Sequence, residues 1–377
     1  MGFKIMTNMQ SRGTKTVFDS VAVGNVTVKN RIMRSATWEG MADAGGRVTD
    51  RLVDVYRKLG AGGTGMVITS VAFVLPEGKA MPGMISASSD GDIPGLSRIA
   101  GAIHNGGAKA FLQIAYGGTQ ARTGVTECTW SPSGIAELST GFSGSAMTEP
   151  DIRRLVRAFA DAAKRASSAG FDGVQLHAAH GYLLSQFLSP LQNRRTDGYG
   201  GTPENRGRII SEIVALIKKE NPDFTVLIKI NGSDQIDGGL TLRDCVEICR
   251  MLDVSGIDGI EVSGGIAAAG DKAAIRGGIR RPEDEGYFFD DASAVADEVG
   301  VPVMSVGGYR SPDVMEQKLN GSNVAMFSMS RPFLAEPDLV GRWRSGDRTK
   351  AKCVSCNKCR TPEGTRCTVF VQQPAGV

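Results

Sequence analysis

Three side chains suited to acid–base chemistry lie close together near the middle of the sequence. His177, His180 and Tyr182 follow the apolar segment 173–176, and the whole chain of 377 residues has only three histidines. Imidazole and phenol groups exchange protons, and imidazole also binds metal ions. Convergent polar groups at a strand end are how an α/β barrel builds an active site. The alternative at this point is that the two histidines only make hydrogen bonds within the fold and have no functional role.

The elements that must position these residues follow a regular alternation of strands and helices. The predicted strands cover residues 31–37, 65–74, 108–115, 172–178, 225–230, 259–263, 303–306 and 324–328. The predicted helices cover residues 50–59, 96–104, 150–168, 203–220, 242–252, 292–298, 313–319 and 336–343. Repeated strand–helix units without a linker predict an α/β fold, a closed (β/α)8 TIM barrel. An open doubly wound sheet is the alternative, but its glycine-rich fingerprint is missing after the first strand.

The chain is predicted to consist of one large domain with short extensions. Residues 1–15 are expected to be a flexible N-terminus, 16–346 the barrel, and 347–377 a cysteine-containing tail. Short apolar pieces flank Gly24 and Asn25, which predicts a β-hairpin before the barrel. The Gly-, Ser- and Thr-rich connection 116–148 is expected to lie over the C-terminal face of the barrel.

Composition excludes several classes of partner. Hydrophobic residues make up 41% and charged residues 22% of the chain, as in ordinary globular proteins. A net charge of +3 gives no basis for binding nucleic acid or a membrane surface. No secretory signal or long apolar span stands out, so a cytoplasmic location is the expectation. The expected partner is a small-molecule substrate, and a homo-oligomer is left open.

Polar residues interrupt or end three of the predicted strands. Gln113 lies in the apolar run 111–114, Lys229 lies in the run 227–230, and Ser35 ends the first strand. A buried lysine is costly unless a partner meets its charge. A carboxylate in the core and an anionic ligand over the barrel mouth would satisfy it equally well.

A candidate phosphate site follows the last two predicted strands. Gly307 and Gly308 follow the seventh strand, and Ser330 and Arg331 follow the eighth. Barrels frequently bind phosphate between these two loops, where glycine exposes backbone N–H groups. Arg331 would add charge-assisted hydrogen bonds. The alternative is that the two glycines only form a tight turn.

Four motifs together resemble the Old Yellow Enzyme family of flavin-dependent ene-reductases and NADH:flavin oxidoreductases, over about residues 16–344. The segment 193–206, NRRTDGYGGTPENR, resembles the family signature N-x-R-x-D-x-Y-G-G-S-x-E-N-R. FDGVQLHAAHGYLLSQFLSP resembles the substrate-binding strand, and KNRIMRSAT resembles the opening strand. The Gly-Gly turn and SRPFLAEPDL resemble the phosphate end, where Gly-Arg is the commoner pair.

The resemblance implies FMN as cofactor and NADH or NADPH as hydride donor. By similarity, Gln113 bonds to the pyrimidine edge of the flavin. Lys229 stabilises the negative charge that builds up when the flavin is reduced. The residues implied for FMN binding are Ser35, Ala36, Thr37, Gln113, Lys229, Gly307, Gly308, Ser330 and Arg331.

The same resemblance implies an activity, the reduction of an α,β-unsaturated carbonyl or similar activated alkene. His177 and His180 would bind the substrate oxygen, and Tyr182 would protonate the near carbon. A phenol with a pKa near ~10 is still protonated at neutral pH, so it can donate a proton. Trp38 and Tyr116 replace the residue types usual in the family. Both are expected on the substrate side, where they would change the size of the pocket.

Four cysteines near the C-terminus keep other functions open. Cys353, Cys356, Cys359 and Cys367 resemble the iron–sulfur linker of larger dienoyl-CoA reductase relatives, with one residue fewer before the third cysteine. One alternative function is therefore an electron-carrying iron–sulfur flavoprotein. Another is a metal-dependent barrel hydrolase that uses the two clustered histidines, for which no third ligand is found. No metal ligands are assigned, and binding of a cluster or zinc by the cysteines is left open.

Overall fold

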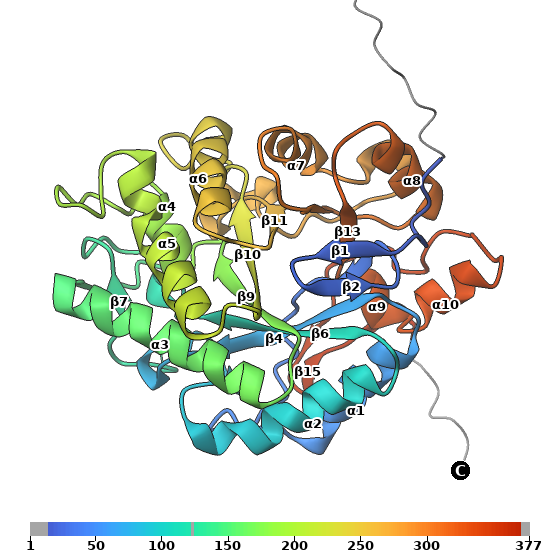
Figure 1. The fold of residues 1–377 in the computed structure, drawn as a ribbon, viewed down its shortest axis with the longest axis horizontal. Helices are drawn as coiled ribbons and strands as arrows, with labels where there is room; N and C mark the ends of the chain where they lie inside the picture. Colours follow the sequence, from blue (N-terminus) through green and yellow to red (C-terminus); the bar gives the residue numbers. More distant parts are fainter. Residues whose placement is uncertain (1–13, 122–123, 371–377) are drawn as a thin grey trace, which may run out of the picture.

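The computed structural model describes residues 14–121 and 124–370, and a closed parallel barrel forms its centre (Figure 1). Each strand pairs in parallel with its neighbours, and β3 pairs with both β13 and β4, which closes the sheet. This arrangement confirms the (β/α)8 barrel and rules out the open sheet. The barrel strands are β3 (Ile32–Arg34), β4 (Met66–Phe73), β6 (Lys109–Ala115), β9 (Gly173–Ala178), β10 (Thr225–Asn231), β11 (Gly259–Ser263), β12 (Val303–Val306) and β13 (Met326–Met329).

The barrel interior changes from apolar to polar along its axis. At the N-terminal end of the strands a buried apolar cluster includes Met33, Met66, Phe111, Leu227, Met304 and Met326. Side chains of a strand alternate between its two faces, so residues two positions further along point inward as well. The polar residues at that level are Ser35, Gln113, Gln175, Lys229, Glu261 and Ser328, and the apolar Ile68 of β4 lies there too. Polar chemistry is therefore confined to the C-terminal half of the interior.

The predicted N-terminal hairpin is present and closes the apolar end of the barrel. Strands β1 (Val21–Val23) and β2 (Val26–Val28) pair antiparallel around Gly24, which has a φ of +54°. Valines of both strands belong to the apolar cluster inside the barrel. The hairpin thus shields this end of the interior from water.

Helices surround the barrel, and most of them begin and end near the predicted positions (Figure 1). Threonine side chains cap four of the helices; Thr148 and Asp151, for example, form a reciprocal capping box. The predicted helices appear as α1 (Asp50–Ala61), α2 (Ile93–His104), α3 (Glu149–Ser168), α5 (Pro203–Glu220), α6 (Leu242–Val254), α7 (Phe289–Ala296), α8 (Pro312–Asn320) and α10 (Leu339–Arg344). Among the described residues, no helix is both long and apolar enough to cross a membrane.

Two helical details differ from the prediction. The expected helix 336–343 is wrong at its start, because α9 (Arg331–Ala335) ends before Glu336 and α10 begins at Leu339. Pro337 disfavours helical backbone at the residue before it, and Glu336 has a φ of −142°. The short helix α4 (Leu183–Leu188) was not predicted. All of its residues are buried, so it lacks the amphipathic period that reveals a helix.

The C-terminal tail lies against the barrel rather than apart from it. Its hairpin, β14 (Arg360–Thr361) and β15 (Gly364–Thr365), docks on the segment that follows β3. There Thr365 donates from its backbone N–H to the Glu39 carbonyl at 2.7 Å, and from Oγ1 to the Trp38 carbonyl at 2.5 Å. A Cβ at Gly364 would lie 2.5 Å from the same Glu39 oxygen, so glycine is needed at this contact.

Candidate active site

A continuous chain of hydrogen bonds crosses the polar half of the barrel. Lys229 Nζ donates to Ser35 Oγ at 2.8 Å and to Glu261 Oε1 at 3.1 Å, and Ser35 Oγ donates to Glu261 Oε1 at 2.7 Å. Gln175 Nε2 donates to Glu261 Oε2 at 2.8 Å, and Gln175 Oε1 accepts from Gln113 Nε2 at 2.8 Å. We call these five residues the interior polar network. Two of them, Gln175 and Glu261, were not predicted as site residues.

The network contains a buried ion pair. Lys229 is 5% exposed and Glu261 is completely buried, and the two are register partners on β10 and β11. Taking two charges out of water is costly, and the cost is repaid only by close pairing and additional hydrogen bonds. The core carboxylate considered for Lys229 therefore exists. Glu261 carried the same sequence signal as Lys229, a charge inside an apolar strand, and was overlooked.

The segment after β3 is held rigidly beside this network. Arg34 and Glu39 form an ion pair at 2.8 Å with both side chains 1% exposed, and Tyr56 OH donates to Glu39 Oε2 at 2.9 Å. Arg34 also contacts the Ser35 carbonyl and Thr37 Oγ1. Thr37 Oγ1 lies 2.6 Å from the Ser330 hydroxyl, which follows β13. Residues implied for the flavin ring and for its phosphate are thus in direct contact.

His177, His180 and Tyr182 form one cluster at the C-terminal end of β9. The two imidazole rings lie 5.4 Å apart, and the rings of His177 and Tyr182 lie 4.3 Å apart. His180 has a φ of +60°, and its Nε2 lies 2.7 Å from Ser263 Oγ. Its backbone N–H donates to Asn231 Oδ1 at 3.2 Å. The structure thus brings the three predicted catalytic side chains together.

Both histidines of the cluster are neutral at physiological pH. Burial, and secondarily the charge of Lys229, lowers the pKa of His177 to about 3. The same causes hold the pKa of His180 well below its usual range. Within the described part of the chain, His177 Nδ1 is buried and has no hydrogen-bond partner. Buried polar atoms rarely remain unpaired, so this nitrogen points to a ligand atom.

An apolar wall adjoins the histidine cluster. Trp38 and Tyr182 both pack against a buried group that includes Phe73, Met81 and Ala115. The indole nitrogen of Trp38 donates to the Pro82 carbonyl at 3.0 Å, which fixes the ring. Tyr182, the predicted proton donor, and Trp38 thus pack against the same apolar group.

Tyr116 differs from its predicted place on the substrate side. Its side chain is 1% exposed and its ring stacks on Trp130 with centroids 5.3 Å apart. The hydroxyl accepts the Trp130 backbone N–H at 3.3 Å. Burial is the main cause that raises the pKa of Tyr116 to about 12. The Tyr116 ring therefore packs against the 116–148 connection through its contact with Trp130.

Gly307 and Gly308 form the predicted turn after β12, in backbone conformations that favour glycine. Their φ values are +146° and +79°. A Cβ at Gly307 would lie 2.9 Å from the Tyr287 backbone nitrogen, and one at Gly308 would lie 2.8 Å from the Tyr287 ring. The missing Cβ atoms thus let the turn pack closely against Tyr287, and the turn follows β12, the neighbour of β13 in the barrel.

Arg331 has partners that the sequence did not predict. Its Nη1 donates to the Arg276 carbonyl at 2.8 Å, in the loop after β11, and contacts Asn357 Oδ1 in the tail. The tail also accepts the Gly278 backbone N–H at the Ser355 carbonyl, at 3.1 Å. Arg331 is therefore positioned by two segments far away in sequence, and the tail is part of the surroundings of the phosphate end.

These residues fit an FMN molecule bound at the C-terminal mouth of the barrel. Among the described residues, Ser328 Oγ joins His177 Nδ1 as a buried polar atom without a partner. Lys229 supplies a cation and Gln113 an amide. Ala36 is half-buried against the apolar cluster below. The donor set is what an anionic, planar cofactor with hydrogen-bonding edges requires.

The tail cysteines are close to one another, and burial shifts the pKa of two of them, Cys353 and Cys359. Burial raises the pKa of Cys353, and burial followed by the nearby Cys353, Cys367 and Cys356 raises the pKa of Cys359 to about 11. None of the four forms a disulfide. Across residues 14–121 and 124–370, no group of three or more His, Cys, Asp or Glu side chains is arranged to hold a metal ion.

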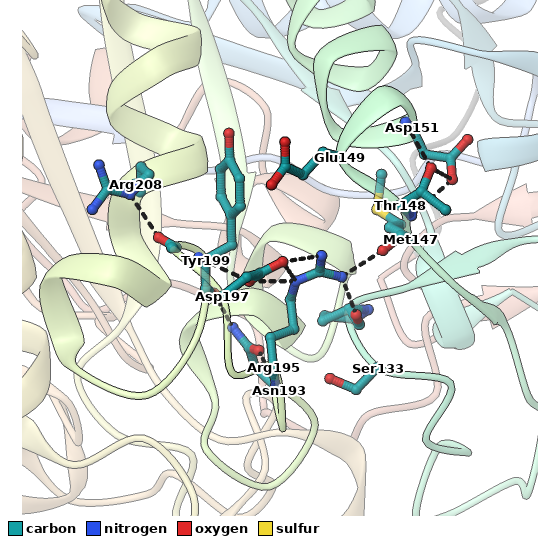
Figure 2. Close-up of polar contacts among 12 residues, drawn as sticks. Ser133, Met147, Thr148, Glu149, Asp151, Asn193, Arg195, Asp197, Tyr199 and Arg208 are labelled. Atoms are coloured by element: carbon teal, nitrogen blue, oxygen red, sulfur yellow. Dashed lines mark hydrogen bonds and ion pairs between the residues drawn. The ribbon is translucent and has the colours of Figure 1, made fainter.

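Side chains of the signature segment 193–206 bind to residues of other loops, and Figure 2 shows Arg195 beside Asp197 and Met147. Arg195 Nη1 donates to the Pro132 carbonyl at 2.8 Å and to the Met147 carbonyl at 2.5 Å, and its guanidinium pairs with Asp197 at 2.5 Å. These two carbonyls lie beside the short strands β7 (Trp130–Ser131) and β8 (Ser145–Ala146). Arg195 thus fastens both ends of the excursion between them.

Asn193 performs a similar task within the signature segment. Its Nδ2 donates to the Phe187 and Tyr199 carbonyls, each at 2.7 Å. Its Oδ1 accepts the Arg195 backbone N–H at 3.2 Å. Arg208 Nε donates to the Gly198 carbonyl at 2.6 Å, as Figure 2 shows. Asn193 and Arg195 therefore use their side chains to satisfy main-chain carbonyls of neighbouring segments.

Comparison with known proteins decides the family. The model of the NADH:flavin oxidoreductase / NADH oxidase family matches residues 16–350. The chain belongs to this family. Its resemblance to the Old Yellow Enzyme family is thereby confirmed. Family membership implies a flavin cofactor with NAD(P)H as hydride donor.

Relatives in the family differ in length. An NADH oxidase of Thermoanaerobacter brockii is 32% identical over 348 residues, which cover 90% of this chain and 52% of that protein. The chain thus spans about half the length of that relative. An NADPH dehydrogenase of Halalkalibacterium halodurans is 33% identical, covering 85% of this chain and 91% of its own. An Old Yellow Enzyme homologue from Zymomonas mobilis shares the fold, with a TM-score of 0.76 at 22% identity over 95% of this chain and all of its own.

Proposed function

We propose that this protein is an FMN-dependent oxidoreductase that passes hydride from NADH or NADPH to an α,β-unsaturated carbonyl or similar activated alkene. The single observation that carries the proposal is that the His177–His180–Tyr182 cluster and the Lys229 cation open at the same end of one barrel. Lys229 and His177 are register partners on neighbouring strands. A family member with these groups side by side has both a cofactor edge and a substrate site.

The chain's own residues would hold FMN from three sides. Gln113 and Lys229 would bind the pyrimidine edge, with Ser35 and Thr37 beside them. The Gly307 turn and the Ser330–Arg331 pair would bind the phosphate through backbone N–H groups and the guanidinium. When bound, FMN would supply the two-electron chemistry that the side chains lack.

The histidine pair would bind the substrate oxygen through neutral N–H groups. Because burial keeps His177 uncharged, it donates a hydrogen bond without placing a full positive charge beside Lys229. Such a bond withdraws electrons from the conjugated double bond and makes its far carbon electrophilic. The neutral state also avoids repulsion between two adjacent cations.

Tyr182 would complete the reaction by giving its phenolic proton to the carbon next to the substrate carbonyl. Hydride adds at the far carbon and the proton at the near carbon, so the alkene gains two hydrogens and NAD(P)H loses a hydride. Solvent then restores the phenol. The apolar wall around Trp38 and Met81 favours substrates with a hydrophobic body.

The test begins with the absorption spectrum of the purified protein under anaerobic conditions. A flavin spectrum that NAD(P)H bleaches, and that returns when a cyclic enone is added, supports the proposal. A protein that bleaches but never returns on addition of any enone is an electron carrier rather than an ene-reductase. A colourless protein that takes up no added FMN contradicts the proposal altogether.

A further inference from the structure

Glu261 occupies the centre of the interior polar network, although no family motif assigns it a role. It is completely buried on β11, and both of its oxygens are used. Oε1 accepts from Ser35 and Lys229, and Oε2 accepts from Gln175. One carboxylate therefore contacts two implied cofactor residues, Ser35 and Lys229, directly, and is linked to a third, Gln113, through Gln175.

The chemistry of a carboxylate fixes the direction of the hydrogen bonds around it. An ionised carboxylate only accepts, so Gln175 must turn its Nε2 toward Glu261 and its Oε1 away. That oxygen in turn receives Nε2 of Gln113, at 2.8 Å. The Gln113 Oε1 is the amide atom that this relay leaves for other partners. A flavin pyrimidine ring carries one N–H, which an amide oxygen can accept.

The same carboxylate determines the net charge beside the cofactor. Lys229 Nζ lies 3.1 Å from Glu261 Oε1, and both groups are shielded from water. An ammonium without its counter-charge would attract electrons onto an adjacent cofactor far more strongly, because charges interact strongly in an interior that excludes water. Glu261 thus offsets the cation that the neighbouring strand supplies.

We propose that Glu261 is a positioning residue that orients the Gln113 amide and moderates the charge of Lys229, and so sets the reduction potential and affinity of the bound flavin. This inference rests on the proposed function, because it requires FMN at the barrel mouth. It goes beyond that function by assigning an electrostatic role to Glu261, whose partners are Ser35, Lys229 and Gln175.

The decisive variant is Glu261→Gln, which keeps the shape of the side chain and removes its charge. We expect the equilibrium constant for reduction of the bound flavin to rise at least about tenfold, which is about 30 mV for a two-electron couple. Glu261→Asp retains the charge and should return the potential toward that of the parent. The potential is measured by dye-coupled redox titration of the flavin-loaded protein, so the readout does not depend on turnover.

The outcomes separate this role from a merely structural one. A Glu261→Gln potential equal to that of the parent, or lower, overturns the inference. Equal shifts in the Gln and Asp variants would indicate distortion of the barrel, and would overturn it too. A parent protein that binds no FMN overturns the proposed function along with the inference, whereas a flavin-loaded parent isolates the role of Glu261.

A second variant keeps the inference testable if Glu261→Gln does not fold. Gln175→Leu cuts the relay to Gln113 and leaves the Lys229–Glu261 pair intact. We expect FMN to bind about three- to tenfold more weakly, the loss of one oriented hydrogen bond, with an unchanged potential. Unchanged FMN affinity, measured by fluorescence titration of the apoprotein, contradicts the relay.

Discussion

The signature segment 193–206 and the interior polar network differ in how easily the sequence reveals them and in what their side chains do. The signature is the most recognisable run of residues in the sequence, yet the side chains of Arg195 and Asn193 donate their hydrogen bonds to main-chain carbonyls. The network is made of single residues from five places in the chain, and includes the buried Lys229–Glu261 ion pair. The most recognisable motif of this chain thus does not mark the interior polar network.

Chain topology explains the difference. A contiguous segment can satisfy neighbouring carbonyls with its own side chains. The residues involved are then close together in the sequence and can be recognised as a motif. The network exists only because parallel register places Gln113 beside Gln175, and Lys229 between His177 and Glu261. Changes in the network should therefore alter chemistry, and changes in the signature should alter stability.

The largest effect is expected at the substrate end of the barrel. Tyr182→Phe keeps the ring and removes the acidic proton, so alkene reduction should fall by about 10²–10⁴-fold. Reduction of the flavin by NAD(P)H should stay near the parent rate. Stopped-flow measurement of the two half-reactions distinguishes them. An unchanged rate with an unactivated enone would mean that Tyr182 is not the proton donor.

The signature provides the opposite case. Arg195→Ala leaves the Pro132 and Met147 carbonyls without their donor and Asp197 without its cation, at a cost of about 3 kcal/mol of folding stability. The neighbouring Arg194→Ala is the control and should stay within about 0.5 kcal/mol, because Arg194 is exposed. Urea unfolding measures both. If Arg195→Ala retained full stability and lost flavin chemistry, the contrast between the two regions would fail.

The third prediction concerns Arg331, and it tests whether this residue binds the phosphate of FMN. Arg331→Ala should weaken FMN retention about tenfold or more, since charge-assisted hydrogen bonds contribute roughly 1.5–3 kcal/mol. Asn357→Ala is the matched control, because it removes the tail contact and keeps the guanidinium. Equal FMN loss in the two variants, determined by equilibrium dialysis, would assign the effect to the tail rather than to phosphate binding.

The smallest expected effect concerns acid stability. The pKa of His177 is about 3 in the fold, below its ordinary value, so between about pH 6.5 and pH 3 only the unfolded chain holds the proton. Lowering the pH through this window therefore favours unfolding, and raising it restores stability. His177→Gln removes this contribution. Its loss of stability from pH 7 to pH 5 should be smaller than the parent's by about 2 kcal/mol in urea titrations.

The control for that series is the histidine at the other end of the barrel. His104 lies next to Asp172, with Nε2 2.7 Å from Oδ2, away from the site. The plot of unfolding free energy against pH should change its slope more in His177→Gln than in His104→Gln. Identical slopes in the parent and His177→Gln would contradict a buried, neutral His177.

Much of the fold was readable from the sequence because its signals are local. Apolar runs bounded by turns predicted all eight barrel strands to within a few residues, and the predicted helices overlap observed helices. The histidine cluster was found because its members are adjacent in the chain. Lys229 was found because a charge inside an apolar strand demands a partner.

The rest required long-range register or packing. Which carboxylate met Lys229 depends on the pairing of β10 with β11, which no single segment encodes. The contact of Asn357 with Arg331 joins the tail to the loop after β13. The inward burial of Tyr116 depends on Trp130, fourteen residues away in a connection without regular period. Such features are properties of the closed barrel rather than of any segment.

Isotope labelling of one product tests ene-reduction at this site most directly. The purified protein reduces 2-cyclohexenone with nicotinamide deuterated at its transferable position, and separately with ordinary NAD(P)H in D₂O. The proposed reaction places the nicotinamide deuterium on the carbon distal to the carbonyl. It places the solvent deuterium on the carbon adjacent to the carbonyl. Product without the nicotinamide label at the distal carbon, or no saturated product from a flavin-loaded protein, would contradict it.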